Sequence, residues 1–253
     1  MIMSHASSTF LTLLFCLGLS LFADAEANDS RSRQVHSPPF LIIADRAVRQ
    51  TSIESVTNIL HHYRKQVKEE WGWTPHGEVF VHIFSETWHY CQETGQPWEF
   101  GGIYQDQRLY LQSPELLEKR GRLKEIIVHE YIHLLIDQET SGNCPLWLNE
   151  GLAVFISEHR GDLAPPDLLM TPTCLDSLFI REPESGEIVS SSDLKQAYLS
   201  AQYYAAQLVQ RYGIQNVRKI LSNLGKDIEF DASFQHFLGQ SVEEFINSCQ
   251  KRP

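Results

Sequence analysis

The sequence predicts an α+β fold in which a small, mostly antiparallel sheet comes first and a helical lobe follows. Short runs with strand character occupy much of the first half of the 253 residues. From residue 123 onward, apolar residues recur at helical spacing instead. Apolar residues make up 42% of the chain, which excludes a disordered protein. This length fits one sizeable domain, or a core domain with an appendage.

The N-terminus predicts an export signal. Residues 10–22 (FLTLLFCLGLSLF) are mostly apolar, and this run is too short to span a membrane comfortably. Ala23-Asp24-Ala25 follows and fits the small-x-small pattern of a cleavage site. We therefore expect residues 1–25 to be a signal peptide and the protein to be secreted or periplasmic. Because no Lys or Arg precedes the apolar run, a retained membrane anchor is the alternative.

Strands dominate the predicted elements of the first half. Residues 26–39 are polar, end in Pro38-Pro39, and are predicted to form a flexible leader. The segment FLIIA then has strand character, and the next apolar residues follow the spacing of an amphipathic helix. We expect strands at 40–44 and 78–84, a helix at 53–71, and a hairpin formed by 101–104 and 108–111.

Helices dominate the second half. The segment 123–137 is apolar nearly all the way round, which is typical of a helix buried inside a domain. Residues 160–192 contain several prolines and are predicted to be an irregular excursion. We expect helices at 123–137, 146–159, 193–212, 214–224 and 242–250. Core packing is the favoured role for Trp71, Trp73, Trp88 and Trp98.

Charge and cysteine content narrow the function classes. The chain has 32 acidic and 21 basic residues, a net charge of −11, which argues against a nucleic-acid-binding protein. Removal of the signal would leave an even number of cysteines, which permits two disulfides in an exported protein, although free buried thiols fit equally well. These cysteines are Cys91, Cys144, Cys174 and Cys249.

The functional prediction centres on His129-Glu130-Tyr131-Ile132-His133. Two histidines four positions apart project from one face of a helix, so their imidazole nitrogens can reach a single Zn²⁺. Glu130 is rotated away from that pair and can face a water molecule. The metal would lower the pKa of this water and polarise a carbonyl, while Glu130 takes the proton. Three ionisable side chains in an apolar helix are costly unless they are paired or bind a metal.

A third ligand is predicted on the next helix. A catalytic zinc takes three protein ligands and leaves its fourth position for water. Glu150 lies in WLNEGLA, in the first turns of the helix that follows a Gly- and Pro-containing turn. Antiparallel packing of the two helices would place Glu150 opposite the histidines. We therefore predict Zn²⁺ as the cofactor and His129, His133 and Glu150 as its ligands.

HEYIH followed by WLNEGLA resembles the Glu-zincins, zinc peptidases in which a Glu on the following helix completes the metal site. The WLNEG-A string is similar to the corresponding segment of the zinc aminopeptidases. The size, the export signal and the order of elements resemble the short peptidases of the MA-like family. The resemblance covers residues 40–250 and implies a thermolysin-like zinc metallopeptidase domain, with an active-site helix beneath a small sheet.

The resemblance also implies a role for Tyr198, near the start of the predicted helix 193–212. In the aminopeptidases a Tyr at the matching position, on a helix that also ends in Gly, donates to the oxyanion. A phenol suits this role because it is neutral at pH 7 and can donate to a developing negative charge. The alternative is that Tyr198 only packs within an amphipathic helix.

The strand before the hairpin turn departs from the aminopeptidase pattern. Those enzymes carry a Gly-x-Met-Glu-Asn strand whose Glu grips the free amine of the substrate. The matching edge strand here contains Gly101, Gly102, Ile103 and Tyr104 and has no such Glu, so the resemblance does not extend to exopeptidase specificity. We predict Gly101, Gly102 and Ile103 as substrate-binding residues, because the strand could pair with an extended peptide and its glycines allow close approach. A simple hairpin with a bulge is the alternative.

Zinc-dependent hydrolysis of a peptide bond is the function that the sequence favours, with Glu130 activating water and a peptide or protein as substrate. A catalytically silent zincin-like module that only captures a peptide is the alternative from another class. A membrane would be a partner only if the N-terminal signal is retained as an anchor.

Overall fold

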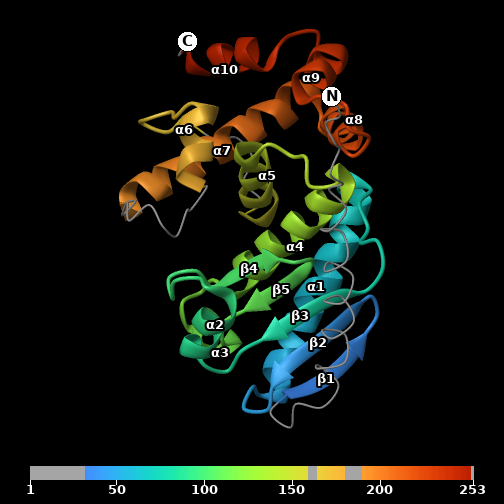
Figure 1. Cartoon of the computed structure of the whole chain (residues 1–253), viewed down its shortest axis with the longest axis vertical. Coiled ribbons are helices and arrows are strands. Elements are labelled where there is room, and N and C mark those ends of the chain that lie inside the picture. The colour runs from blue at the N-terminus through green and yellow to red at the C-terminus, as the bar shows by residue number, and fades with distance from the viewer. Residues whose placement is uncertain (1–31, 159–163, 180–189, 252–253) are drawn as a thin grey trace, which may run out of the picture.

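The protein has an α+β fold with a five-stranded mixed sheet in its N-terminal half and a helical lobe after it (Figure 1). The computed structural model describes residues 32–158, 164–179 and 190–251. The sheet and the late helices lie at opposite ends of the molecule, and α4 (Leu123–Thr140) runs between them (Figure 1). The predicted export signal, residues 1–25, lies outside the described residues, and no helix within them is long and apolar enough to cross a membrane.

The sheet is mixed rather than mostly antiparallel. Its strand order is β1-β2-β3-β5-β4, in which the two inner pairings are parallel and the two outer pairings are antiparallel. The physical reason is that α1 (Gln50–Trp71) separates β2 from β3, and a helical crossover returns the chain in the same direction. The strands are β1 (Ser32–Ser37), β2 (Phe40–Asp45), β3 (Val79–Ile83), β4 (Gly102–Gln105) and β5 (Arg108–Leu111).

Part of the predicted flexible leader forms a strand. Residues Ser32–Ser37 are β1, which pairs with β2 along its whole length around the Pro38-Pro39 turn. The composition of β1 is polar because it is an edge strand with no fully buried side chain, and its apolar residue, Val35, packs against the core. Its stability comes from the backbone groups along the edge of β2, which local composition does not reveal. The remaining leader residues, 26–31, lie outside the described residues.

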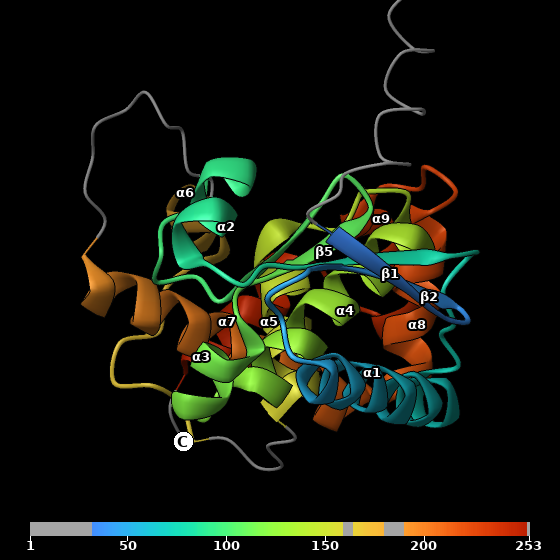
Figure 2. The ribbon, with the colours of Figure 1, turned by 90° about the horizontal axis from the view of Figure 1, so that it is seen from below.

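One face of the sheet carries the core. Side chains alternate along β3 and β5, so that Val79, Val81 and Ile83 are buried together with Leu109 and Leu111. Helices α1 and α4 lie on the same side of the sheet (Figure 2) and contact each other as well as the strands. The prediction that α4 is buried is confirmed, since its side chains from Ile126 to Ile136 are mostly enclosed.

The predicted hairpin is confirmed, and it ends the sheet. Strands β4 and β5 pair antiparallel, and β4 is an edge strand. Asp106 and Gln107 form the turn and both have positive φ, at 50° and 60°. This geometry is that of a two-residue turn matched to the twist of the strands.

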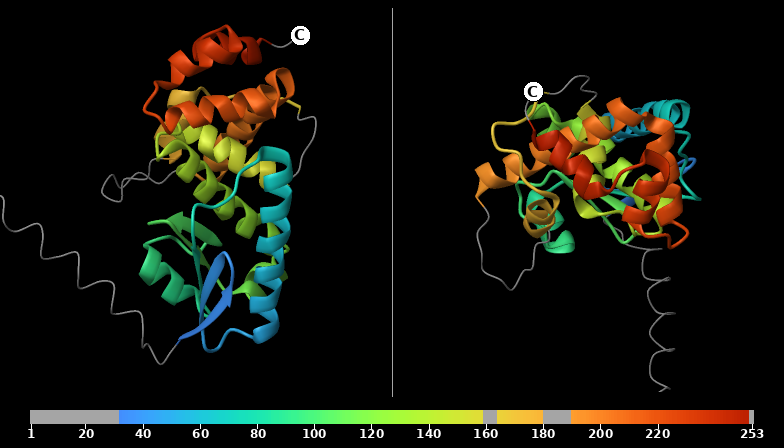
Figure 3. Two further views of the ribbon diagram at one scale, coloured as in Figure 1. Left: turned by 90° about the vertical axis from the view of Figure 1, so that its right-hand side faces the viewer. Right: turned by 90° about the horizontal axis from the view of Figure 1, so that it is seen from above.

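The five helices predicted in the second half are present, and the described residues form four further short helices, of which two lie before α4 and two after it. The short ones are six to nine residues long, so their apolar spacing is a weak signal. The prediction of an irregular excursion at 160–192 is wrong for Pro172–Phe179, which form α6, because a proline is well accommodated in the first turn of a helix. The helices not given above are α2 (Thr87–Thr94), α3 (Pro114–Lys119), α5 (Leu146–Glu158), α6 (Pro172–Phe179), α7 (Ser191–Tyr212), α8 (Ile214–Leu224), α9 (Phe230–Leu238) and α10 (Val242–Gln250). Figure 3 shows how the last of these stack at the end of the molecule away from the sheet.

The prediction of core packing holds for two of the four tryptophans. Trp71 and Trp73 are buried against each other, as predicted. Core packing is wrong for Trp88 and Trp98, which are 66% and 56% exposed on and just after α2. The two tryptophans at the end of α1 meet the core, whereas α2 lies at the margin of the sheet.

The four cysteines are all free thiols in this structure.

Candidate metal centre

Three side chains from two helices converge at one point. His129 and His133 lie one turn apart on α4, and Glu150 lies on α5, which packs directly against α4. One ligand atom from each lies within 4.8 Å of the others, so the group could hold a metal ion. The three side chains are between 11% and 18% exposed, which leaves the cluster largely shielded yet reachable.

The spacing of these atoms fits a small divalent cation. The Nε2 atoms of His129 and His133 are 2.9 Å apart. The Oε2 atom of Glu150 lies 3.4 Å from Nε2 of His129 and 3.5 Å from Nε2 of His133. Tetrahedral zinc with ligands at its usual bond lengths needs ligand separations of about 3.3 Å. Glu150 Oε2 is also buried and makes no hydrogen bond, so a cation between the three atoms would satisfy it.

The electrostatics of the cluster follow from its burial and its opposite charges. Burial opposes a charge on His133, but the neighbouring Glu150 carboxylate outweighs it and raises the pKa of His133 to about 9. Burial would raise the pKa of Glu150, yet the His133 and His129 imidazoles hold that pKa well below its usual range. A cation that binds here therefore has to displace a proton from His133.

Asn149 orients one of the histidines. Its side-chain oxygen accepts a hydrogen bond from Nδ1 of His133 at 2.8 Å. Since Nδ1 is the nitrogen that donates to Asn149, Nε2 faces His129 and Glu150, and its lone pair becomes available to a cation once its proton is displaced. Sequence reasoning did not select Asn149. The sequence does carry a signal for Asn149, because it directly precedes Glu150 and therefore lies on the same helical turn.

Replacing Asn149 by Ala is expected to weaken zinc binding by about 10- to 100-fold, because the ring of His133 loses the partner that fixes its tautomer. The measurement is the zinc dissociation constant in competition with a chromophoric chelator. Asn149→Asp keeps an acceptor oxygen and should restore most of the affinity. An Ala variant that binds zinc as tightly as the wild type would contradict this role.

Glu130 lies beside the cluster and is held by the backbone of the sheet edge. Its Oε2 atom accepts a hydrogen bond from the Tyr104 backbone N–H at 2.7 Å, and the residue is 8% exposed. Burial raises the pKa of Glu130, and the nearby imidazoles oppose that rise. A carboxylate with a raised pKa next to a metal site is suited to accept a proton near neutral pH.

The edge of β4 faces the site. Gly101 accepts a hydrogen bond from Gln112 on the β5 side, and the register pairs Ile103 with Tyr110. Because inward and outward backbone groups alternate in an antiparallel pair, those of Gly102 and Tyr104 point to the open edge. The outward groups thus belong to Gly102 and Tyr104, whereas those of the predicted Gly101 and Ile103 are directed into the hairpin.

Two glycines allow the close packing that builds the site. A side chain on Gly102 would place its first carbon 2.8 Å from Ile126 and 3.1 Å from Glu130, so this glycine brings β4 against α4. A side chain on Gly151 would lie 2.3 Å from the carbonyl oxygen of Ala201. Gly151 therefore permits close contact between α5 and α7. That contact places Tyr198 near the residues that α5 and α4 contribute.

The cluster lies where two cavities adjoin. One cavity has a volume of about 790 Å³ and the other about 380 Å³. Both are lined by His129, Glu130, Gly102 and Tyr198. The centroid of the Tyr198 ring lies 6.3 Å from that of His129 and 5.1 Å from that of Phe179. The structure thus brings Tyr198 to the candidate metal site, together with the edge of β4.

Comparison of the sequence with models of protein families gives no match, and comparison with curated proteins gives none either. The fold and the site define an α+β protein with a His-His-Glu group that could bind a metal, an arrangement compatible with a zincin.

Proposed function

We propose that this protein is a zinc metallopeptidase of the Glu-zincin type with a thermolysin-like catalytic domain. The observation that carries the proposal is the convergence of His129, His133 and Glu150 where two cavities meet, with the Glu130 carboxylate beside them. A structural zinc site is closed by four protein ligands and has no need of a further buried carboxylate. A three-ligand group opening into a cleft is the arrangement that hydrolysis requires.

Each residue of the site has a distinct part in the proposed reaction. Zinc held by the three ligands would polarise the substrate carbonyl and lower the pKa of a water molecule. Glu130 accepts the proton of the attacking water and delivers it to the leaving amine, because it is the carboxylate directly beside the three proposed ligands that is not itself one of them. The hydrogen bond from Tyr104 N–H fixes one oxygen of Glu130 and so orients the other.

The sheet edge supplies the binding mode for an extended peptide. Gly102 lines both cavities and Tyr104 lines the smaller one. The outward backbone groups of Gly102 and the outward carbonyl of Tyr104 can pair with the main chain of a substrate, while the Tyr104 N–H donates to Glu130. A peptide paired in this way crosses the candidate metal site and leaves side chains in the cavity on either side. This geometry favours a peptide or protein over a small hydrolysable ester.

Tyr198 is proposed to donate a hydrogen bond to the oxyanion that forms on the substrate carbonyl. Tyr198→Phe is expected to keep zinc and to lower kcat by about 10²–10³-fold, because the donor is lost without a change in shape. The measurement is steady-state peptide hydrolysis together with metal content. Tyr203→Phe on the same helix is the matched control and should leave kcat unchanged. A Tyr198→Phe variant with wild-type kcat would show that this ring serves packing alone.

The proposal as a whole is tested with the purified chain and a mixed peptide library. We expect bound zinc, cleavage of part of the library, loss of cleavage with a chelator and its return when zinc is added. A chain that binds zinc and retains peptides without cutting any of them would instead be the catalytically silent module. A chain that binds no zinc would overturn the proposal.

A further inference from the structure

Tyr104 makes two hydrogen bonds to the same helix, and the proposed mechanism uses only one of them. Its backbone N–H donates to Oε2 of Glu130 at 2.7 Å, and its phenol donates to Oδ2 of Asp137 at 2.6 Å. Glu130 and Asp137 lie seven residues apart on α4, a spacing that places them on one face of a helix, two turns apart. The two bonds therefore attach β4 to α4, which runs beside it (Figure 1), at two separate points.

Asp137 occupies a position where a helix disfavours a carboxylate. It lies in the last turn of α4, which ends at Thr140, and the unpaired carbonyl groups of that turn form the negative end of the helix dipole. A negative side chain here is destabilising unless another contact compensates for it. The Tyr104 phenol supplies such a contact, because a hydrogen bond to a charged acceptor is shorter and stronger than one between neutral groups.

The surroundings of the Tyr104 side chain favour this hydrogen bond. The ring is half-buried and packs against the hydrophobic core, so water shields the bond only in part. Burial raises the pKa of the phenol, and the Asp137 carboxylate raises it further. The phenol therefore keeps its proton at neutral pH and acts as the donor.

The end of β4 that carries Tyr104 depends on such an anchor. Strand β4 has four residues, lies at the edge of the sheet and ends at the turn formed by Asp106 and Gln107. Both turn residues have positive φ, and neither is glycine, which adopts this conformation without steric cost. At the other end of the strand, Gly102 packs directly on α4. Tyr104 thus attaches the turn end of β4 to the helix, as Gly102 does at the opposite end.

We infer that Tyr104 is a positioning residue whose phenol, by bonding to Asp137, holds β4 where the Tyr104 N–H can fix Glu130. This inference rests on the proposed peptidase function, in which Glu130 accepts and delivers the proton. Without the phenol, the turn end of β4 can move away from α4, and the Glu130 carboxylate can rotate once its N–H partner is displaced. Substrate pairing at Gly102 changes less, because the packing of that glycine on Ile126 does not involve the phenol. The effect therefore falls on kcat rather than on KM.

The kinetic test compares Tyr104→Phe with the wild type, both as the full zinc-loaded protein, on one peptide that the wild type cleaves. We expect kcat to fall by about tenfold and KM to change by less than about twofold, because a small displacement of a reacting group costs turnover steeply. Asp137→Ala should give the same fall in kcat, and the double variant should fall no further, since both changes remove one bond. Asp137→Asn keeps an acceptor oxygen and should retain most of the wild-type kcat.

A second kinetic comparison asks whether the phenol acts through Glu130. In a Glu130→Gln background there is no proton acceptor left to position, so Tyr104→Phe should leave the residual turnover unchanged. If it lowered the residual turnover by the full tenfold, the phenol would act on another part of the site and the inference would be wrong.

Amide hydrogen exchange tests the same inference without turnover or zinc. In the zinc-free protein, the Tyr104 amide followed by NMR should exchange about tenfold faster in Tyr104→Phe than in the wild type, because local opening of β4 becomes easier. Tyr212→Phe is the matched control. Its phenol accepts a hydrogen bond from Gln240 at the end of α7 and lines neither cavity, so both kcat and the exchange of the Tyr104 amide should keep their wild-type values.

The outcomes separate this inference from the proposed function. A Tyr104→Phe variant with wild-type kcat, or one whose kcat falls without faster exchange of the Tyr104 amide, overturns the inference and leaves the peptidase proposal intact. A wild type that cleaves no peptide contradicts the proposed function itself. The exchange measurement then still shows whether the phenol holds the Tyr104 N–H on Glu130.

Discussion

Glu130→Gln is expected to keep its zinc and lose nearly all turnover, with kcat falling by about 10²–10⁴-fold. Gln has the shape of Glu, and its amide oxygen can still accept the hydrogen bond from the Tyr104 N–H. The amide of Gln cannot accept a proton, so the attacking water is not deprotonated. The measurement is kcat on a cleaved peptide, paired with the zinc content of the same preparation.

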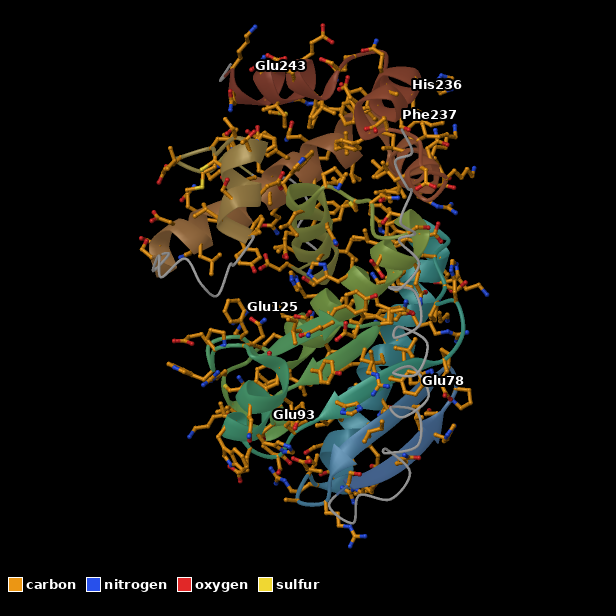
Figure 4. All side chains as sticks on the ribbon, in the orientation of Figure 1. Glu78, Glu93, Glu125, His236, Phe237 and Glu243 are labelled. Atoms are coloured by element: carbon orange, nitrogen blue, oxygen red, sulfur yellow. The ribbon has the colours of Figure 1, made fainter. Side chains whose placement is uncertain are left out.

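The control for this variant is a carboxylate far from the cleft. Glu243 lies exposed on α10 at the far end of the helical lobe (Figure 4). Glu243→Gln removes the same charge and should leave both zinc content and turnover at wild-type values. If Glu130→Gln turned over peptide as fast as the wild type, the assignment of Glu130 as the proton acceptor would be wrong.

His133→Ala should lose zinc and activity together. The change removes one of three ligands and also leaves the Asn149 side chain without its partner. It further leaves the buried Glu150 carboxylate with one fewer cationic neighbour, so thermal stability should fall. The measurements are the zinc content by metal analysis and the melting temperature, each compared with the chelator-treated wild type.

A surface histidine provides the comparison. His236 is exposed on α9, against Phe237 and remote from the cleft (Figure 4). His236→Ala should bind zinc as the wild type does. If His133→Ala retained a full equivalent of tightly bound zinc, the metal would bind at another site, and the proposed mechanism would be wrong.

The group of three candidate metal ligands was predictable because its geometry is mostly local. Residues four apart on one helix always share a face, so the spacing of His129 and His133 fixed their convergence before any tertiary contact was known. Glu150 follows after one short turn, which leaves few ways to pack the two helices. The buried character of α4 was visible in its apolar composition for the same reason.

The sheet was less predictable because the direction of a strand depends on what connects it to its neighbour. Strand β1 is polar, and it forms because its backbone pairs with the free edge of β2. The parallel pairings follow from the helices that lie between the paired strands in the chain. The same limit applied to Trp88 and Trp98. Their apolar character suggested a core, but Trp88 on α2 and Trp98 in the segment after it are 66% and 56% exposed.

The sequence by itself determined that three side chains that could bind a metal and a neighbouring carboxylate lie on two consecutive helices, since helical periodicity and a short turn dictate that arrangement. Only the tertiary structure decided what surrounds them. Asn149 against His133, Tyr104 N–H against Glu130, and Gln202 against Glu158 join residues 16, 26 and 44 positions apart. Such contacts depend on how α4, α5, α7 and β4 pack in three dimensions, and helical periodicity carries no information about packing between elements distant in sequence.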